Sequence, residues 1–217
     1  MRRFYLGSVA AILAIGVANA QPAPPAQPPQ PAPRPAAMCA SADQIKQVSA
    51  LYASKPGMPL ANASAALKMP EAVVASALPK DQAVVLSGAE FTKLWETMAA
   101  WPSAVGLIMR NGSVFELPGK IMIGEQSTRS NFYNLKPGGG FTGHLRHDMM
   151  STIAVVAIPG KDAAVTRGAF FYDGAGDPVF GEFVAGEGGE GSAPNAAGLA
   201  AFDKTMALAK TLPKACK

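Results

Sequence analysis

The residues best suited to chemistry stand together in one short stretch of the sequence. The chain has two histidines, His144 and His147, and both lie in Gly138–Asp148, which reads GGGFTGHLRHD. A histidine can move a proton or ligate a metal near neutral pH. No G-x-S-x-G, H-E-x-x-H, P-loop or C-x-x-C motif accompanies them, and no motif marks a serine for a catalytic triad. These residues therefore favour a binding site over an enzyme.

The glycine run before His144 suits a flat ligand, because glycine lets a backbone approach closely or adopt positive φ. A porphyrin needs an apolar slot, an imidazole for its iron and a cation for its propionates. Apolar strands, His144 and Arg146 would supply these three. Under this interpretation His144 ligates haem iron, and Arg146, Arg129 or Lys136 lies near the propionates. The alternative is that His144 is an ordinary loop residue.

A copper site is a second hypothesis for the same stretch. His144, His147, Met149 and Met150 fall within seven residues, and Met/His sets suit copper in an oxidising compartment. If the stretch is a strand, side chains alternate between its faces, so only one of the two methionines could join the histidines.

The N-terminus predicts export. Residues 1–20 contain two arginines, an apolar run from Phe4 to Val17 and then Ala18-Asn19-Ala20, which is the layout of a cleaved signal peptide. The run is shorter than the roughly 20 residues of a membrane span. We therefore expect a periplasmic or secreted protein without a membrane span after cleavage, the alternative being an uncleaved anchor. Next, Gln21–Pro35 contains eight prolines, and residues 21–38 are expected to form a solvated polyproline II linker.

Composition limits the partners. Of the 217 residues 49% are hydrophobic and 16% are charged, which argues against wholesale disorder. The formal charge is +4, two units of which come from Arg2 and Arg3 in the signal peptide. Because no Lys/Arg-rich run follows, we expect no nucleic-acid partner. The two cysteines, Cys39 and Cys216, are predicted to form a disulfide after export. Free thiols or metal binding are the alternatives.

Two parts of the chain must position these residues. Residues 39–80 read as three short helices, from Asp43 to Ala53, from Asn62 to about Lys68, and between Pro70 and Pro79. Residues 81–217 read as a sheet with two further helices, one opened by a capping box of Ser87 and Glu90 and one capped by Asn195. The expected strands are Ala83–Leu86, Val105–Met109, Ser113–Leu117, Phe132–Leu135, Phe141–Leu145, Thr152–Ile158, Gly168–Tyr172 and Val179–Val184. Hairpins without helical crossovers indicate an antiparallel sheet and the α+β class.

The sequence also resembles a known family. The stretches are LPKDQAVVLSGAEFTKLWETMAAW, VGLIMRNGSVFELPG, NFYNLKPGGGFTGHLRHDMMSTIAVVA and AFFYDGAGDPVFGEFVAGE. In this order they resemble the HutX/ChuX family of haem-utilisation carriers over roughly Ala42–Glu187, most specifically in the F-Y-N-L, G-G-G and G-H-L-R elements. The resemblance implies a HutX/ChuX/HemS-like saddle of antiparallel sheet, with a small N-terminal helical segment and a C-terminal helix. It also implies a homodimer that binds haem and exchanges it with a donor or acceptor protein.

The match to the family's functional residues is partial. His144 matches the family's histidine in the G-G-x-x-G-H loop, and Met109 stands where some members have a second histidine proposed for haem. Because methionine ligates haem iron in cytochromes, the resemblance suggests a His144–Met109 axial pair, the alternative being that Met109 fills the core. The family's F-K-I-F-V-G-R-D-E segment reads FGEFVAGE at Phe180–Glu187, so a lysine and an arginine are lost. The family is also cytoplasmic, whereas this chain carries an export signal.

Three hypotheses of function follow. The first is an exported haem carrier without enzymatic activity, holding haem between the sheet and the glycine-rich loop. The second is an exported interaction module that has kept the fold and lost the ligand. The third is the periplasmic copper-binding module.

Overall fold

The structure is a computed structural model that describes residues 33–110, 112–160, 164–186 and 193–216. The predicted signal peptide and most of the predicted linker lie outside the described residues. The described residues belong to one compact unit. Within these ranges no helix has the length and apolar character that crossing a membrane requires.

Three short helices begin the folded part: α1 (Ala42–Ser54), α2 (Leu60–Leu67) and α3 (Glu71–Ser76). A capping box starts α1, in which the Ser41 hydroxyl accepts from the Gln44 backbone N–H and the Gln44 side chain accepts from the Ser41 N–H. Helix α2 begins directly after Pro59, so the expected N-cap at Asn62 is wrong. Proline fixes φ and needs no hydrogen-bond partner for its nitrogen, which suits it to a helix start.

A six-stranded antiparallel sheet follows, with strand order β1-β7-β8-β9-β2-β3. Its strands are β1 (Ala83–Ser87), β2 (Ala104–Arg110), β3 (Ser113–Gly119), β7 (Thr152–Pro159), β8 (Val165–Tyr172) and β9 (Pro178–Val184). Each strand pairs antiparallel with its neighbours. The expected α+β class with an antiparallel sheet is confirmed.

A second, three-stranded sheet carries the candidate histidine. It has the order β4-β5-β6 and consists of β4 (Gly124–Gln126), β5 (Tyr133–Leu135) and β6 (His144–Leu145). The sequence did not predict β4, and the strand expected at Phe141–Leu145 is reduced to two residues. Its N-terminal half cannot continue as a strand because Gly143 adopts a φ of 143° and the preceding glycines form a loop.

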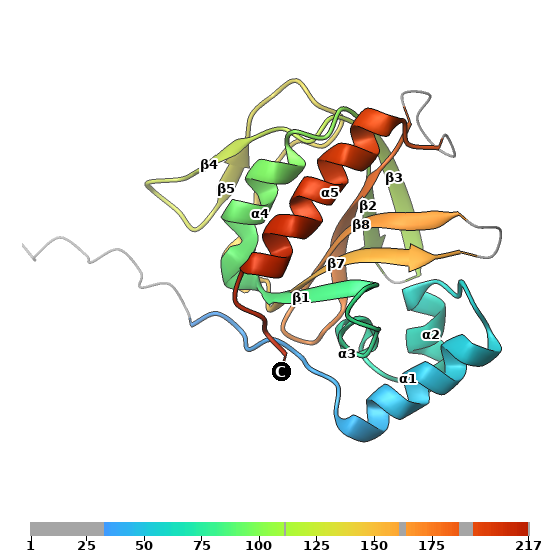
Figure 1. The fold of residues 1–217 in the computed structure, drawn as a ribbon. Helices are drawn as coiled ribbons and strands as arrows, with labels where there is room; N and C mark the ends of the chain where they lie inside the picture. Colours follow the sequence, from blue (N-terminus) through green and yellow to red (C-terminus); the bar gives the residue numbers. More distant parts are fainter. Residues whose placement is uncertain (1–32, 111, 161–163, 187–192, 217) are drawn as a thin grey trace, which may run out of the picture. The chain divides into compact units, whose positions relative to one another are not determined.

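Helices cover both faces of the six-stranded sheet (Figure 1). The 3₁₀ turn η1 (Gly88–Glu90) leads into α4 (Phe91–Met98), and α4 lies beside α5 (Ala196–Thr211) on one face. The expected capping box is wrong, because the Ser87 hydroxyl accepts from Ala89 N–H and Glu90 pairs instead with Lys93 at 3.0 Å. The expected Asn195 cap of α5 is confirmed.

Each face of the large sheet has its own hydrophobic core. The core on the α4/α5 face includes Phe91, Trp95, Tyr133, Leu135, Phe141, Ile153, Val155, Phe171, Phe180 and Phe202. The core on the α1–α3 face includes Val48, Leu60, Val74, Val85, Ala154, Val156, Phe170 and Tyr172. Neighbouring residues of β7 alternate between the two cores, as strand geometry requires. The small sheet packs on the α4/α5 face, because its inward residues Tyr133 and Leu135 belong to that core.

The expected disulfide between Cys39 and Cys216 is present, with the two Cα atoms 5.5 Å apart. The residues just before it depart from the expectation of a solvated linker. Arg34 donates to the carbonyl oxygens of His147 and Met150, and the Met38 backbone N–H donates to the Thr152 hydroxyl at 3.1 Å. We call Pro33–Cys39 the strap. Donors in these residues find acceptors on the folded domain, which is why the strap lies on it.

Candidate functional site

His144 points away from the core of the small sheet. In β5 and β6 the side chains of Tyr133, Leu135 and Leu145 pack into the α4/α5 core, so Asn134 and His144 lie on the opposite face. The strand register pairs Asn134 with His144 directly. Asn134 Oδ1 lies 2.7 Å from His144 Nδ1, while the imidazole as a whole is exposed.

Phe132 and Arg146 complete the surroundings of His144. The ring centroids of Phe132 and His144 are 5.9 Å apart with the rings at 62°. The Arg146 guanidinium lies 5.7 Å from the Phe132 centroid, in cation–π distance. Two nitrogens of Arg146 donate to the two carboxylate oxygens of Asp148, both at 2.8 Å. This pairing lowers the pKa of Asp148 and raises that of Arg146. We call Phe132, Asn134, His144 and Arg146 the His144 patch.

The patch has the hydrogen-bonding pattern of a metal-binding imidazole. Because Asn134 Oδ1 is an acceptor, the proton of a neutral His144 lies on Nδ1, and the lone pair lies on Nε2 of this exposed imidazole. Metal-ligating histidines commonly donate their other N–H to a fixed oxygen, which sets the tautomer and the ring orientation. Phe132, next to the imidazole, offers a flat apolar surface, and Arg146, next to Phe132, a guanidinium suited to a carboxylate.

The other two predicted cations lie at different places on the small sheet. Arg129 is exposed in the connection between β4 and β5, on the side of Phe132 and Arg146. Lys136 is exposed at the far end of β5, where its backbone N–H donates to the Ile123 carbonyl. The structure therefore groups Arg146 most closely with His144 and places Arg129 and Lys136 at opposite ends of β5.

Met109 is not part of this patch. Its side chain packs against the α1–α3 core, next to residues of α2. His144 lies beyond the α4/α5 core, so the six-stranded sheet separates the two. The structure does not bring the suggested His144–Met109 axial pair together, and Met109 has the packing role that was the alternative.

The copper set does not converge either. The His147 ring stacks on Phe91, with centroids 5.0 Å apart, and its Nε2 lies 2.8 Å from the Gln126 Oε1. Burial, followed by the nearby Arg34, lowers the pKa of His147. Met150 is 3% exposed in the core and Met149 is 47% exposed. The expectation fails because residues 147–149 form a 3₁₀ turn, η2 (His147–Met149), which sends these side chains in different directions.

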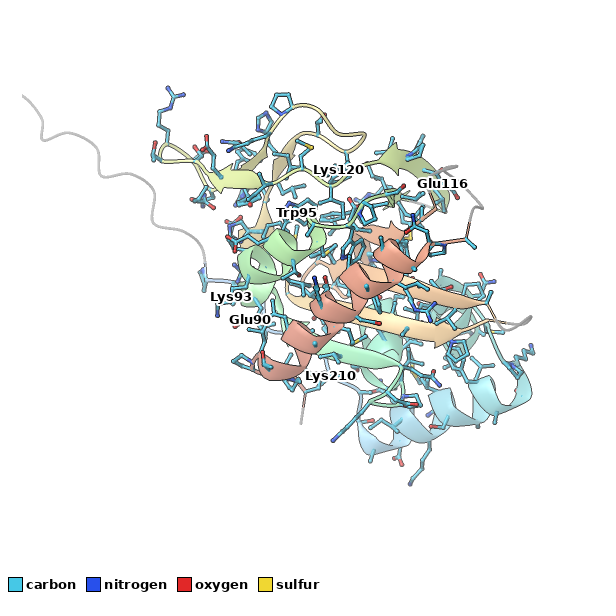
Figure 2. The ribbon with its side chains drawn as sticks, turned by 45° about the horizontal axis from the view of Figure 1, so that its top comes forward. Glu90, Lys93, Trp95, Glu116, Lys120 and Lys210 are labelled. Carbon is cyan, nitrogen blue, oxygen red and sulfur yellow. A yellow bond between two sulfur atoms is a disulfide. The ribbon has the colours of Figure 1, made fainter. Side chains whose placement is uncertain are left out.

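The space between the large sheet and the glycine-rich loop is filled by aromatic side chains. Phe141 is 7% exposed and its ring lies 5.4 Å from that of Phe180 and 6.2 Å from that of Trp95. The indole N–H of Trp95 donates to the Met122 carbonyl at 2.9 Å. Figure 2 labels Trp95 on α4 and Lys120 on the segment that follows β3. A haem held between the sheet and this loop, as the sequence led us to expect, would have to displace that core.

The glycines of the loop allow its backbone to pack directly against the backbone that ends and follows β3. A Cβ on Gly140 would lie 2.1 Å from the Pro118 carbonyl oxygen, and one on Gly139 would lie 2.2 Å from the Lys120 carbonyl oxygen. Both distances are far below van der Waals contact. The glycine run therefore lets the loop lie directly on the segment at the end of β3, and its role is structural.

The α1–α3 face carries a cavity that the sequence did not indicate. It has a volume of about 460 Å³, within the range of ligand pockets. Its walls include Met58, Leu107, Phe170 and Phe183, with Arg167 at the polar side. Within the part of the chain that the structure describes, its lining contains no histidine. Seven stretches that are separate in the sequence build it, which is why no local pattern revealed it.

The residues that sequence reasoning missed at the His144 patch are Asn134 and Phe132. Both stand in the quoted F-Y-N-L element, on alternate positions of a strand, and that alternation places them on one face. The sequence could not predict which residue of this strand pairs with His144, because the glycine-rich loop separates β6 from β5.

Comparison with known proteins identifies the family. The profile described as "Haem utilisation ChuX/HutX" matches residues 84–204, more than half of the chain. The chain therefore belongs to the ChuX/HutX haem-utilisation family. A comparison with curated proteins gives no match.

Solved structures agree on the fold. The crystal structure of ChuX has a TM-score of 0.66 at 18% identity, covering 76% of this chain and 99% of that one. Apo-PhuS, a haem-binding protein from Pseudomonas aeruginosa, has a TM-score of 0.58 at 14% identity, covering 84% of this chain and 51% of that one. The haem-degrading enzyme ChuS from Escherichia coli O157:H7 has a TM-score of 0.59 at 13% identity, covering 81% and 50%. The chain thus corresponds to about half the length of PhuS and ChuS.

Proposed function

We propose that this protein is an exported haem carrier that ligates haem iron through His144 Nε2 at the His144 patch. The observation that carries the proposal is the exposed imidazole whose Nδ1 is held 2.7 Å from the Asn134 Oδ1. An imidazole held in this way presents its lone pair to an incoming metal with little reorganisation. Membership of the haem-utilisation family supports haem iron as the metal that His144 binds.

The surroundings of His144 suit a porphyrin bound at the surface. The ring would lie against Phe132, and a propionate would compete with Asp148 for the Arg146 guanidinium. The haem itself would supply the iron and its affinity for imidazole. A haem bound on an open surface leaves its second face accessible, which suits transfer to or from a partner protein and supports a carrier rather than an enzyme.

Export and dimerisation belong to the same proposal. The signal-peptide pattern of residues 1–20 and the Cys39–Cys216 disulfide support a periplasmic or secreted location, where disulfides persist. A homodimer is supported by strand β3, which lies at one edge of the six-stranded sheet and exposes Val114 and Phe115 by 55% and 60%. Exposed apolar edge strands are surfaces that a second chain can cover.

The second candidate is an exported interaction module without haem. Two observations favour it. Aromatic side chains fill the space under the glycine-rich loop, and Met109 packs against the α1–α3 core, away from His144. Both hypotheses predict the same fold and differ in whether the patch takes up haem.

Titration of the purified, exported protein with haemin, followed by the Soret band, separates the two. We expect saturable one-to-one binding, weakened in His144→Ala by at least about tenfold, as for loss of metal-site partners. Two matched controls should bind like wild type: Met109→Ala on the opposite face of the sheet, and Leu107→Trp, which places a larger side chain in the wall of the 460 Å³ cavity.

Absence of saturable binding would leave the interaction module. Wild-type binding by His144→Ala would remove haem from the patch. If Leu107→Trp alone lost binding, the haem site would be the cavity on the α1–α3 face.

A further inference from the structure

We infer that Arg34 is a positioning residue of the haem site: the strap delivers its guanidinium to the turn after β6 and so holds the orientation of His144. The inference rests on the proposed function, because the oriented imidazole is the proposed iron ligand. It concerns a residue outside the region that matches the family, which begins at residue 84.

The first step is what Arg34 touches. One guanidinium nitrogen donates to the carbonyl oxygens of His147 and Met150, the latter at 3.0 Å. The second nitrogen lies 3.5 Å from His147 Nδ1. Because arginine only donates, Nδ1 is the accepting nitrogen and Nε2–H donates to Gln126 Oε1. Arg34 therefore binds the backbone at both ends of the turn. It also fixes the tautomer of the His147 ring.

The second step is that a glycine of the domain leaves space for the Arg34 side chain. Gly88 lies against the turn, and a Cβ there would sit 2.0 Å from the Met150 carbonyl oxygen and 3.0 Å from the Arg34 guanidinium. Burial lowers the pKa of Arg34, opposed by the nearby Asp148. A half-buried guanidinium has lost part of its hydration and needs acceptors, which the carbonyls of the turn supply.

The third step is how the strap is anchored. Pro35 packs against Gly174, where a Cβ would come within 3.0 Å of the proline ring. The backbone N–H of Met38 donates to the Thr152 hydroxyl, and Cys39 is bonded to Cys216. Figure 1 shows this blue segment passing the C-terminal segment before it enters α1. The residues that follow Arg34 in the strap are thus held on the domain by three contacts distant in sequence.

The fourth step links the turn to His144. Strand β6 has only two residues and pairs with β5 alone, so its own ladder holds it weakly. Three residues after His144, the His147 ring is fixed by Phe91, Gln126 and Arg34. The intervening Arg146 is the cation of the patch. Loss of Arg34 would leave the His147 carbonyl without its charged donor and would loosen the turn that anchors the strand.

The test compares Arg34→Gln and Arg34→Lys with Arg110→Gln, a matched substitution of an exposed arginine at the far end of β2. Two quantities are measured: amide hydrogen exchange of residues 144–150 without haem, and the Soret position and affinity with haemin. We expect faster exchange in Arg34→Gln, a changed iron spectrum and affinity lowered by about tenfold, as for other outer-shell residues of metal sites. Arg34→Lys should recover part of both, since lysine keeps the charge but not the two-pronged donor.

Unchanged exchange and spectrum in Arg34→Gln would overturn the inference. So would a loss of affinity matched by Arg110→Gln, since that would reflect general stability. If the wild type bound no haem, the proposed function would fail and with it the role at a haem site, while the exchange data would still decide whether Arg34 holds the turn.

Discussion

Glu182 is a buried carboxyl group whose ionisation should make a large contribution to the pH dependence of stability. It lies on β9 with 1% of its surface exposed, and both carboxylate oxygens are buried without a hydrogen-bond partner among the described residues. Gly106 and Phe141 enclose it, since a Cβ on Gly106 would lie 3.2 Å from one carboxylate oxygen and 3.1 Å from the Phe141 ring. Burial alone raises the pKa of Glu182 to about 8.

The magnitude follows from the difference between folded and unfolded states. The unfolded pKa is the ordinary value of 4.5 and the folded pKa is about 8, so the fold holds the protonated acid. The contribution of Glu182 to the free energy of unfolding is then highest below pH 4.5, falls as pH rises to 8, and is constant above it. The slope is about 1.4 kcal/mol per pH unit, which makes about 3 kcal/mol between pH 5 and pH 7.

The perturbation is Glu182→Gln, which keeps the shape and removes the titration. Urea unfolding at pH 5, 6 and 7 can be followed by the fluorescence of Trp95 and Trp101, both fully buried. The variant should match or fall slightly below wild type at pH 5 and exceed it at pH 7, with the difference changing by about 3 kcal/mol. Glu71, whose pKa burial raises to about 7, titrates in both proteins and cancels from the difference.

Glu125→Gln, on the exposed strand β4, is the matched control and should follow wild type at every pH. Parallel pH profiles for Glu182→Gln and wild type would refute the reasoning, because they would mean that Glu182 does not change protonation on unfolding in this range.

Three further predictions concern the site and the core. Asn134→Ala should weaken haemin binding by about tenfold, since it frees the His144 ring, whereas Asn134→Asp should keep the acceptor and most of the affinity, both measured by Soret titration. The double variant Cys39→Ser/Cys216→Ser, which opens a loop of sequence separation 177, should lower the free energy of unfolding by about 3–5 kcal/mol; a loss below 1 kcal/mol would contradict the constraint. Phe141→Ala should cost about 3–5 kcal/mol in urea unfolding, and a near-neutral result would mean that the loop is not part of the core.

Several features of the fold were predictable because they depend on residues near one another in the chain. The hairpin of β2 and β3 follows from a turn that contains Gly112, whose φ is 77°. The cap of α5 follows from Asn195, whose side-chain oxygen accepts from Gly198 N–H within the first turn. The family's G-H element likewise identified His144 as the candidate ligand.

Alternation along a strand separates faces but does not say what lies on each face. Met109 and His144 are each matched to a family position separately, yet the six-stranded sheet and the α4/α5 core lie between them. Only the strand order β9-β2-β3 and the docking of α2 decide that Met109 faces the helices. The sequence could therefore suggest a ligand pair that the tertiary structure keeps apart.

The sequence by itself determined the class of the fold, the choice of His144 as the candidate ligand and the pairing of the two cysteines, since these rest on composition, local pattern and family motifs. The tertiary structure alone decided the orientation of His144 by Asn134, the filling of the loop space by Phe141, and the docking of Arg34 on the turn after β6. These contacts join residues far apart in the chain or on strands whose register is set by a loop. Their partners are chosen by which donors, acceptors and apolar surfaces remain unsatisfied once the sheets have formed.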